Sequence, residues 1–516
     1  MQSPCEAGSE PAPQSVPHTN GTFCPQSRRR YVLISAILAS ALGFIDGSVV
    51  SIALPAIRAD LSASLVDAQW ISNAYALTLS ALILVGGAAG DRFGMRRAFI
   101  AGISFFIATS LLCAFAPNAP FLIGARALQG VGAALMVPGS LAIIAKAYPK
   151  AERGRAIGIW AAASALTTAL GPVVGGMVLS AFDDSVWRAI FAVNLPLGGL
   201  AIFLLIAKVP DDSPTEKRKL DIGGAALATV ALGSLAYGLT SGASGAGPVA
   251  FIAAGLFALA VFLWWEARAE APMMKLSLFS IAAFSGANAA TFCLYFALSG
   301  ILFFLPMLLI AGWGVDEAQT GFIFLPLSAA IALLSGFVGR LADRIGPRVP
   351  IAGGSLVVAL AFAGLALLVG SGIRHFWTGV FPLMVLMGLG MALVVSPLSS
   401  AVMTAVEDDD TGAASGINNA VSRIAGLVAV AVLGVVVAGR YAAVLGGTPD
   451  MPGFGEPGNL PGDAEALRIA ASDAALAAVA WVTAALSLAA ALIAWATTPG
   501  AGDTAPANDI HEKVAG

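Results

Sequence analysis

Apolar segments of eighteen or more residues recur along nearly the whole chain, and their length limits its fold more than any other feature. About 20 consecutive apolar residues are enough for a helix to cross the hydrocarbon core of a bilayer. Hydrophobic residues make up 58% of the 516 positions and charged residues only 11%, too few to cover a water-soluble surface of this size. The sequence therefore predicts an all-α polytopic membrane protein whose main solvent is the lipid bilayer. Fourteen spans are expected near residues 31–56, 68–89, 98–117, 121–146, 155–181, 189–208, 221–241, 248–265, 281–310, 317–341, 349–370, 378–404, 413–438 and 473–497.

Positive charge indicates how the spans are oriented. Of the 27 Lys and Arg residues, two fall inside spans and only five fall in loops on the side opposite the N-terminus. These five are Arg58, Arg188, Arg374, Arg440 and Arg468. Loops rich in Lys and Arg stay in the cytoplasm, and an even number of spans returns the chain to the side on which it began. We therefore expect a multi-pass protein of the cytoplasmic membrane with both termini in the cytoplasm.

Three short motifs occur twice in the same order, which indicates two homologous halves. The sequence "GAAGDRFGMRR" from Gly87 matches "GRLADRIGPR" from Gly339, 252 residues later. "GVGAAL" matches "GLGMAL", and "GRAIG" matches "GAASG", each pair 258 residues apart. Repeated halves around a central binding site are typical of secondary transporters. The expected layout is a disordered cytoplasmic N-tail at 1–30, a six-helix bundle at 31–208, cytoplasmic linkers with two extra helices at 209–278, a second six-helix bundle at 279–498 with an extracytoplasmic loop near 440–472, and a disordered cytoplasmic C-tail at 499–516.

Two charged residues, Asp46 and Arg126, lie inside first-half spans at a shared depth. Asp46 is about fifteen residues into a span that leaves the cytoplasm, which at 1.5 Å per residue is roughly 22 Å. Arg126 is about five residues into a span that runs the other way, so in a core about 30 Å thick both are roughly 8 Å from the outer face. If both face a cavity between the halves, they can pair or compete for the same polar groups.

Two interpretations of Asp46 stay open. A charge at the membrane centre costs about 2.5–3.5 kcal/mol on insertion scales and therefore commonly marks a functional site. A carboxyl group that opens alternately to each side could take up a proton outside and release it inside, with protonation linked to release of a substrate. Alternatively, the acid forms a static bridge with Arg126 or caps polar groups within the bundle.

Four motifs resemble those of the major facilitator superfamily, in its branch of fourteen-span drug:proton antiporters. They are "DGSVVSIALP" from Asp46, "GDRFGMRR" from Gly90, "LIGARALQGVGAA" from Leu122 and "TTALGPVVGG" from Thr167. The last is similar to the antiporter motif and keeps Gly171, Pro172, Gly175 and Gly176. The resemblance extends over residues 31–497 and implies two pseudo-symmetric six-helix bundles with two extra helices between them. It also implies proton-coupled efflux of small amphipathic or cationic compounds by alternating access.

The resemblance further implies a conformational latch in the cytoplasmic loop after the second span. We expect Asp91 to face a helix N-terminus near Gly412, where the helix dipole favours an anion, and the arginines to reach the acids at 407–410. The alternative is that the positive charge serves topology alone. The latch residues are Gly87, Asp91, Arg92, Gly94, Arg96 and Arg97, with Gly339, Asp343, Arg344 and Gly346 in the second half.

Aromatic and amide side chains inside the spans are candidates for a substrate cavity, because ring faces attract lipophilic and cationic ligands. Packing and interfacial anchoring are the alternative. We identify no acid within the second-half spans, and we interpret Arg423 and Asn418 as interhelical hydrogen-bonding groups. The cavity candidates are Phe44, Trp70, Tyr75, Gln129, Phe292 and Tyr295.

The sequence lacks the patterns that several other functions need. It contains no CxxC or Cys/His cluster for a metal and no G-x-x-x-x-G-K-[ST] loop for ATP, so we expect no cofactor and a drive from the proton gradient. No catalytic cluster or appended domain supports an enzyme or a sensor, and a net charge of −3 suggests no nucleic-acid partner. The expected partners are a small-molecule substrate and protons, and a monomer suffices because one chain carries both halves. An exporter dedicated to one metabolite or self-made antibiotic would carry the same motifs.

Overall fold

The computed structural model describes residues 23–182, 184–212, 221–241, 246–270, 272, 274–407, 410–448, 451–458 and 460–500, which are almost entirely helical. The first bundle contains α1 (Arg29–Leu61), α2 (Leu65–Phe93), α3 (Met95–Ala114), α4 (Ala119–Ala147), α5 (Lys150–Ala181), α6 (Trp187–Ala192) and α7 (Asn194–Lys208). Two helices follow it, α8 (Ile222–Thr240) and α9 (Ala246–Glu266). The second bundle contains α10 (Ala282–Met307), α11 (Glu317–Gly321), α12 (Leu325–Ile345), α13 (Arg348–Gly370), α14 (Phe381–Thr404), α15 (Thr411–Leu445) and α16 (Asp463–Thr497).

The lengths of these helices confirm a polytopic membrane protein. Within the described ranges, thirteen helical stretches are long and apolar enough to cross a membrane. The 29-residue helix α2, which is not one of these thirteen stretches, runs beside α4. The short helices do not span alone, because α6 and α7 belong to one stretch and α11 and α12 to another.

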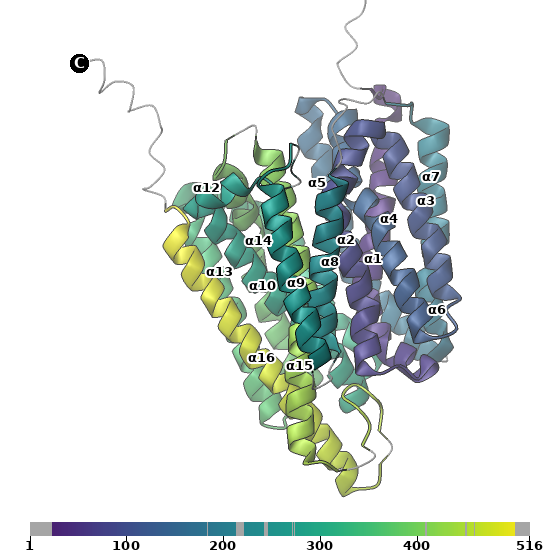
Figure 1. Ribbon diagram of the computed structural model, residues 1–516, viewed down its shortest axis with the longest axis vertical. Coiled ribbons are helices and arrows are strands. Elements are labelled where there is room, and N and C mark those ends of the chain that lie inside the picture. The colour runs from purple at the N-terminus through teal and green to yellow at the C-terminus, as the bar shows by residue number, and fades with distance from the viewer. Residues whose placement is uncertain are drawn as a thin grey trace, which may run out of the picture.

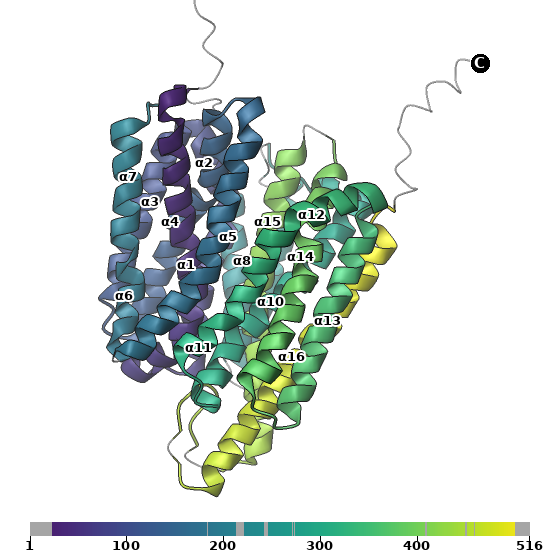
Figure 2. The same ribbon diagram turned by 180° about the vertical axis from the view of Figure 1, so that it is seen from behind.

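The two bundles lie side by side and diverge toward the end of the molecule where α1 begins and α16 ends (Figure 1). We call this end the termini end, and we call the opposite end, where the loop between α15 and α16 lies, the strap end. The view from behind shows the same divergence (Figure 2). The bundles touch where α5 meets α11 and α12, and where α2 meets α15. Helix α8 covers the contact between α2 and α15, and α9 packs on α8.

Buried apolar side chains show where the bundles are joined. One core runs from the strap half of the first bundle, with Val50 and Ile57 of α1, into the second bundle, with Phe304 of α10. The termini half of the first bundle has a separate core. Of the described residues of the second bundle, only Ala420 of α15 packs into this core. The bundles are therefore packed together at the strap end and separated at the termini end.

Residues 446–462 connect α15 with α16, and we call this segment the strap. Arg58 of α1 is only 2% exposed, donates from Nη1 to the carbonyl oxygen of Phe454 at 2.6 Å, and forms an ion pair with Glu456. Arg468 of α16 donates from Nη1 to the carbonyl oxygen of Glu456 at 3.0 Å. The strap therefore ties the first bundle to the second across the end where both are in contact.

The strap is shorter than the loop expected near 440–472, because both flanking helices extend into that range. Helix α15 continues to Leu445 and ends at Gly446, whose φ of +61° suits a residue without a side chain. Helix α16 already begins at Asp463 and has acidic residues in its first turn, where the helix dipole favours negative charge.

The longer α16 also corrects the expectation that the second-half spans contain no acid. Asp473 lies within α16 and is 5% exposed. Its carboxylate accepts hydrogen bonds from Trp313 Nε1 at 2.7 Å and from Arg374 Nη2 at 2.8 Å. The second bundle therefore does contain a buried acid, and a cation and an indole bind it.

The longest repeated motif forms the same backbone turn in both halves. Gly94, between α2 and α3, has φ +90°, and Gly346, between α12 and α13, has φ +79°. Residues with a side chain rarely adopt such angles. At Gly94, an added Cβ would also lie 3.2 Å from the carbonyl oxygen of Asp212. The glycines of this motif are therefore required by two equivalent turns at the termini end.

Replacing Arg58 by alanine is expected to loosen the strap end. A hydrogen bond from a charged donor is worth about 1.5–3 kcal/mol, although exposure of Glu456 reduces its share. A cysteine placed at the buried Ala53, in an otherwise cysteine-free protein in lipid nanodiscs, should react with a water-soluble maleimide about tenfold faster, which corresponds to 1.4 kcal/mol. The exposed Arg440 provides the control, since Arg440→Ala should not change the rate. An equal rate in Arg58→Ala and in the unaltered protein would contradict this role.

Candidate functional site

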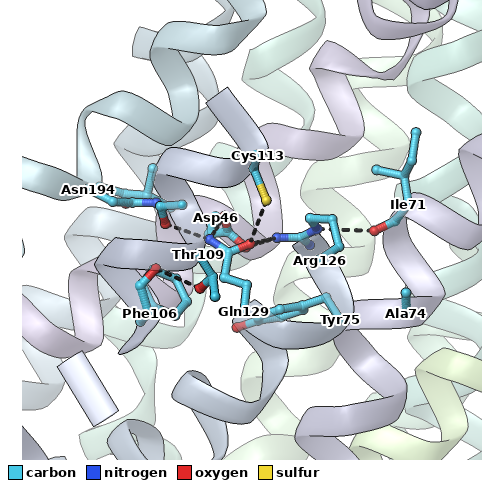
Figure 3. A network of polar contacts seen from close by, with 12 residues as sticks. Asp46, Ile71, Ala74, Tyr75, Phe106, Thr109, Cys113, Arg126, Gln129 and Asn194 are labelled. Carbon is cyan, nitrogen blue, oxygen red and sulfur yellow. Dashed lines mark hydrogen bonds and ion pairs between the residues drawn. The ribbon is translucent and has the colours of Figure 1, made fainter. Parts of the chain in front are cut away.

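The two charges expected inside the first-half spans contact each other in the core of the first bundle (Figure 3). Asp46 of α1 is 0% exposed and accepts a hydrogen bond from Arg126 of α4, which is 2% exposed. Gln129 lies one turn along α4; its Oε1 accepts from Arg126 Nη1 at 2.6 Å, and its Nε2 donates to Asp46 Oδ1 at 3.1 Å. These three side chains form a closed ring of hydrogen bonds, which we call the Asp46 ring.

Polar groups from three further helices surround the Asp46 ring. Gln129 Nε2 donates to Ser110 Oγ of α3 at 2.8 Å, and Asn194 Nδ2 of α7 donates to the same oxygen at 3.1 Å. On the other side, Arg126 Nε donates to the carbonyl oxygen of Ile71 in α2 at 3.1 Å. Five helices of the first bundle therefore converge on one ion pair.

Aromatic rings cover the guanidinium of Arg126. Its Cζ lies 4.3 Å from the ring centre of Tyr75 and 5.8 Å from that of Phe191. A guanidinium over a ring face is attracted by the electrons of the ring. We expected the ring face of Tyr75 to be available to a cationic ligand, but the guanidinium of Arg126 occupies it.

Two glycines allow α4 to hold the pair at this place. A Cβ on Gly130 would lie 2.4 Å from the carbonyl oxygen of Tyr75 in α2, and a Cβ on Gly132 would lie 2.7 Å from the backbone nitrogen of Phe106 in α3. Small residues of this kind let membrane helices approach closely. The motif from Leu122 to Ala134 thus supplies both the charge and the close packing that buries it.

Burial makes each charge depend on the other. Removing one member of a buried pair leaves an uncompensated charge and costs about 3–5 kcal/mol. Asp46 is completely covered, so a proton reaches its carboxylate only when the surrounding helices move. The arrangement therefore places an acid where protein atoms separate it from solvent in every direction.

The pair lies within the first bundle and does not bridge the two halves, so the condition that both residues face a cavity between the halves is not needed for them to pair. Within the described part of the chain, all its hydrogen-bond partners belong to the first bundle. Sequence reasoning missed Ser110 and Asn194, which draw the ring toward α3 and α7. The available signal was a polar residue within an apolar run, in "FFIATSLLC" and "IFAVNLPLG".

The antiporter motif lies where α5 crosses α1 and α11. Its residues Gly171, Pro172, Gly175 and Gly176 all belong to α5. A Cβ on Gly175 would lie 2.4 Å from a side chain of α1, and one on Gly176 would lie 2.3 Å from the carbonyl oxygen of Glu317. In the same way, a Cβ on Gly321 of α11 would lie 2.6 Å from the carbonyl oxygen of Pro172. The motif therefore forms part of the contact between the bundles at the strap end.

The arginines of the expected latch bind acids of their own bundle instead. Arg96 and Arg97 both pair with Asp211, which follows α7. The carboxylate of Asp212 accepts a hydrogen bond from the backbone nitrogen of Met95 at 2.7 Å, at the start of α3. The loop after α2 is thereby fastened to the end of α7.

In this arrangement, in which the bundles diverge at the termini end, the ion pairs of Arg96 and Arg97 among the described residues are to Asp211 and not to Glu407 or Asp410. Asp410 is bound by Lys275 Nζ at 2.6 Å. The side chain of Asp91, expected near Gly412, and residues 408–409 lie outside the described part of the structure. The remaining latch residues lie toward the termini ends of α2 and α12: Gly87, Arg92, Gly339, Asp343 and Arg344.

The expected cavity residues do not form a single cluster. Trp70 packs on Tyr237 of α8, with ring centres 6.2 Å apart, so the inserted helix covers it. Phe292 lies 6.1 Å from Phe296 of its own helix. The other four are partly or fully buried: Phe44, Tyr75, Gln129 and Tyr295.

Comparison with known proteins matches residues 36–430 to the family model described as Major Facilitator Superfamily. The chain is 35% identical to the multidrug resistance protein Stp of Mycobacterium tuberculosis, over 79% of this chain and 76% of that protein. It is 32% identical to the tetracenomycin C resistance and export protein of Streptomyces glaucescens, over 84% of this chain and 80% of that protein. Among solved structures, a bacterial homologue of the lysosomal transporter Spinster, in an inward-facing and unoccupied conformation, has a TM-score of 0.66 at 16% identity and covers 94% of this chain and 100% of its own.

Replacement of Arg126 by leucine is expected to reduce the free energy of unfolding by about 3–5 kcal/mol, because Asp46 is left as an unpaired buried charge. The double variant Asp46→Asn, Arg126→Leu should recover much of the loss, since no charge then remains in the ring. Thermal unfolding of the purified proteins in detergent measures the difference. A single variant no less stable than the double variant would contradict the buried ion pair.

Glycine-to-alanine changes at two positions of α5 should have effects of opposite sign. Gly176→Ala overpacks the contact with α11, and overpacking costs about 1–3 kcal/mol. Gly158 has no atom within 4 Å of an added Cβ, so Gly158→Ala should stabilise the helix by about 0.5–1 kcal/mol. Unfolding midpoints that shift in the same direction would contradict the close contact at Gly176.

Proposed function

The chain belongs to the major facilitator superfamily, and from that premise we propose that it is a proton-driven exporter of small amphipathic compounds across the cytoplasmic membrane. Its relatives include drug- and antibiotic-resistance exporters. The observation that carries the proposal is the buried Asp46 ring, in which one titratable acid is held by a cation within one of the two bundles. The termini end is proposed to face the cytoplasm, so that the described arrangement is open to the cytoplasm.

In the proposed cycle, the bundles separate at the strap end and close at the termini end. The movement opens the surroundings of Asp46 to the outer side, where its carboxylate takes up a proton and loses its charge attraction to Arg126. During the return movement the helices around Asp46 open it toward the cytoplasm, and the proton leaves as the ion pair forms again and the acid is covered as in the present arrangement. One charge crossing 100 mV is worth about 2.3 kcal/mol, enough for roughly a fifty-fold gradient of substrate per proton.

An exporter dedicated to one compound remains the second candidate, and the comparisons supply a reason to keep it. The Streptomyces glaucescens relative is named for a single antibiotic, tetracenomycin C, whereas the Mycobacterium tuberculosis relative is named for multidrug resistance. The motifs described above are compatible with a single substrate and with many substrates. A panel of chemically unrelated probes separates the two, because a dedicated exporter moves only one of them.

The role of Asp46 can be tested in proteoliposomes with an imposed proton gradient, using ethidium and tetracenomycin C as probes. Asp46→Asn should abolish accumulation driven by the gradient, reducing a ratio of up to about fifty-fold toward one. Exchange of labelled for unlabelled probe should persist, since it needs no proton. Asp60, nearer the strap end of α1 and paired with Arg188, provides the control, and Asp60→Asn should accumulate normally. Proton-dependent accumulation that survives in Asp46→Asn would contradict the proposal, as would loss of exchange together with accumulation.

A further inference from the structure

Arg423 is a charged residue within the membrane span of α15 whose charge the protein does not balance. Its side chain is partly buried, and within the described residues no hydrogen bond or ion pair engages its guanidinium. Asn418 does make the interhelical bonds that the sequence suggested, donating to Asn288 Oδ1 at 3.2 Å and Thr291 Oγ1 at 2.8 Å. A guanidinium stays protonated in proteins, and a charge at this depth costs about 2.5–3.5 kcal/mol on insertion scales. Arg423 therefore requires an explanation other than packing.

Helix geometry directs Arg423 toward the first bundle. A Cβ on Gly434 of α15 would collide with the side chain of Gln69 in α2, so Gly434 lies on the face of α15 that meets α2. Arg423 precedes Gly434 by eleven residues, almost three complete turns, and so lies on the same face. Gln69 Nε2 donates to the carbonyl oxygen of Val430 at 2.7 Å. The two helices run in opposite directions, so two turns from this bond Arg423 comes level with Ala76, next to Tyr75.

The surroundings of Arg423 come from both bundles. Tyr75 of α2 is next to the residue that is level with Arg423, and Tyr295 of α10 lies one turn beyond Thr291, which accepts a hydrogen bond from Asn418 of α15. Ala420, one turn nearer the termini end, packs into the core of the first bundle. Arg423 therefore lies between the bundles, at the level where they begin to separate, with one phenol from each of them nearby.

Charges at this level do not cancel. Arg126 balances the charge of Asp46 within the first bundle, and Gln129 donates a hydrogen bond to it, whereas no described residue forms an ion pair with Arg423. Arg126 also occupies the ring face of Tyr75 at 4.3 Å. A cation entering between the bundles would meet a repelling charge and one ring already in use, while an anion would find a planar donor beside two aromatic residues.

We propose that Arg423 binds a carboxylate or phenolate of the exported compound, so that the substrates are amphipathic aromatic acids rather than cations. This inference rests on the proposed export function and narrows its substrate class. The guanidinium offers paired N–H donors that match a carboxylate, and the partly buried Tyr295 offers apolar ring surface to the rest of the molecule. The anion and the transported proton then occupy different places, at Arg423 and Asp46, and movement of the bundles couples them.

Two dyes with the same xanthene ring system but opposite charge provide the test: fluorescein, an anion, and rhodamine 6G, a cation. Fluorescence anisotropy with the full-length protein in nanodiscs of zwitterionic lipid measures the Kd for each dye. Arg423→Gln should weaken fluorescein binding about tenfold or more, as expected for loss of a charge-assisted hydrogen bond, and leave rhodamine 6G unchanged or improved. Arg423→Lys keeps the charge without the planar fork and should be intermediate. Arg440→Gln, at an exposed position of the same helix, should leave both Kd values unchanged.

Equal fluorescein binding by Arg423→Gln and the unaltered protein would overturn the inference, as would an unaltered protein that binds rhodamine 6G and not fluorescein. The proposed export function has a separate outcome. Fluorescein that binds through Arg423 but is never moved against its gradient by imposed protons would support the anion site and contradict proton-driven export. An Arg423→Gln protein whose thermal unfolding midpoint equals that of the unaltered protein would show that the loss of fluorescein binding does not arise from misfolding.

Discussion

The buried contact between Asp46 and Arg126 is the interaction around which the first bundle is arranged. The hydrocarbon core supplies no water, so every polar group there must find its partner within the protein. That requirement recruits Gln129 to close the ring, Ser110 to accept from the amide of Gln129, and Asn194 to donate to Ser110. The convergence of five helices on one point follows from it, as do the glycines that let α4 approach its neighbours.

The two halves share a backbone plan but differ in their charges. The turns at Gly94 and Gly346 are equivalent, as descent from a duplicated unit would produce. The first bundle balances its buried acid with a cation near the middle of the membrane span, whereas the acid of the second bundle, Asp473, is bound by Arg374 and Trp313 toward the strap end. Among the described residues of the second bundle, none forms an ion pair with Arg423. In the proposed mechanism, this asymmetry of charge lets the first half carry a proton and the second half recognise the exported compound.

Much of this architecture could be predicted from local pattern. The lengths of the apolar segments predicted the positions of the helices. The 1.5 Å rise per residue predicted that Asp46 and Arg126 share one depth in the membrane, and the two residues are in contact there. Features that depend on which helices become neighbours could not be obtained in that way. The pairing of Arg96 and Arg97 with Asp211 depends on how far apart the bundles lie, and the covering of Trp70 depends on where α8 docks.

The strap has a pharmacological consequence. Residues 446–462 hold the bundles together through Arg58 and Arg468, on the face proposed to be outermost, so each turnover must release this fastening and restore it. A ligand or antibody fragment that recognised the fastened strap would arrest the carrier without entering it. Such an inhibitor would act independently of cargo concentration, and changes that alter cargo preference near Arg423 would give no escape from it.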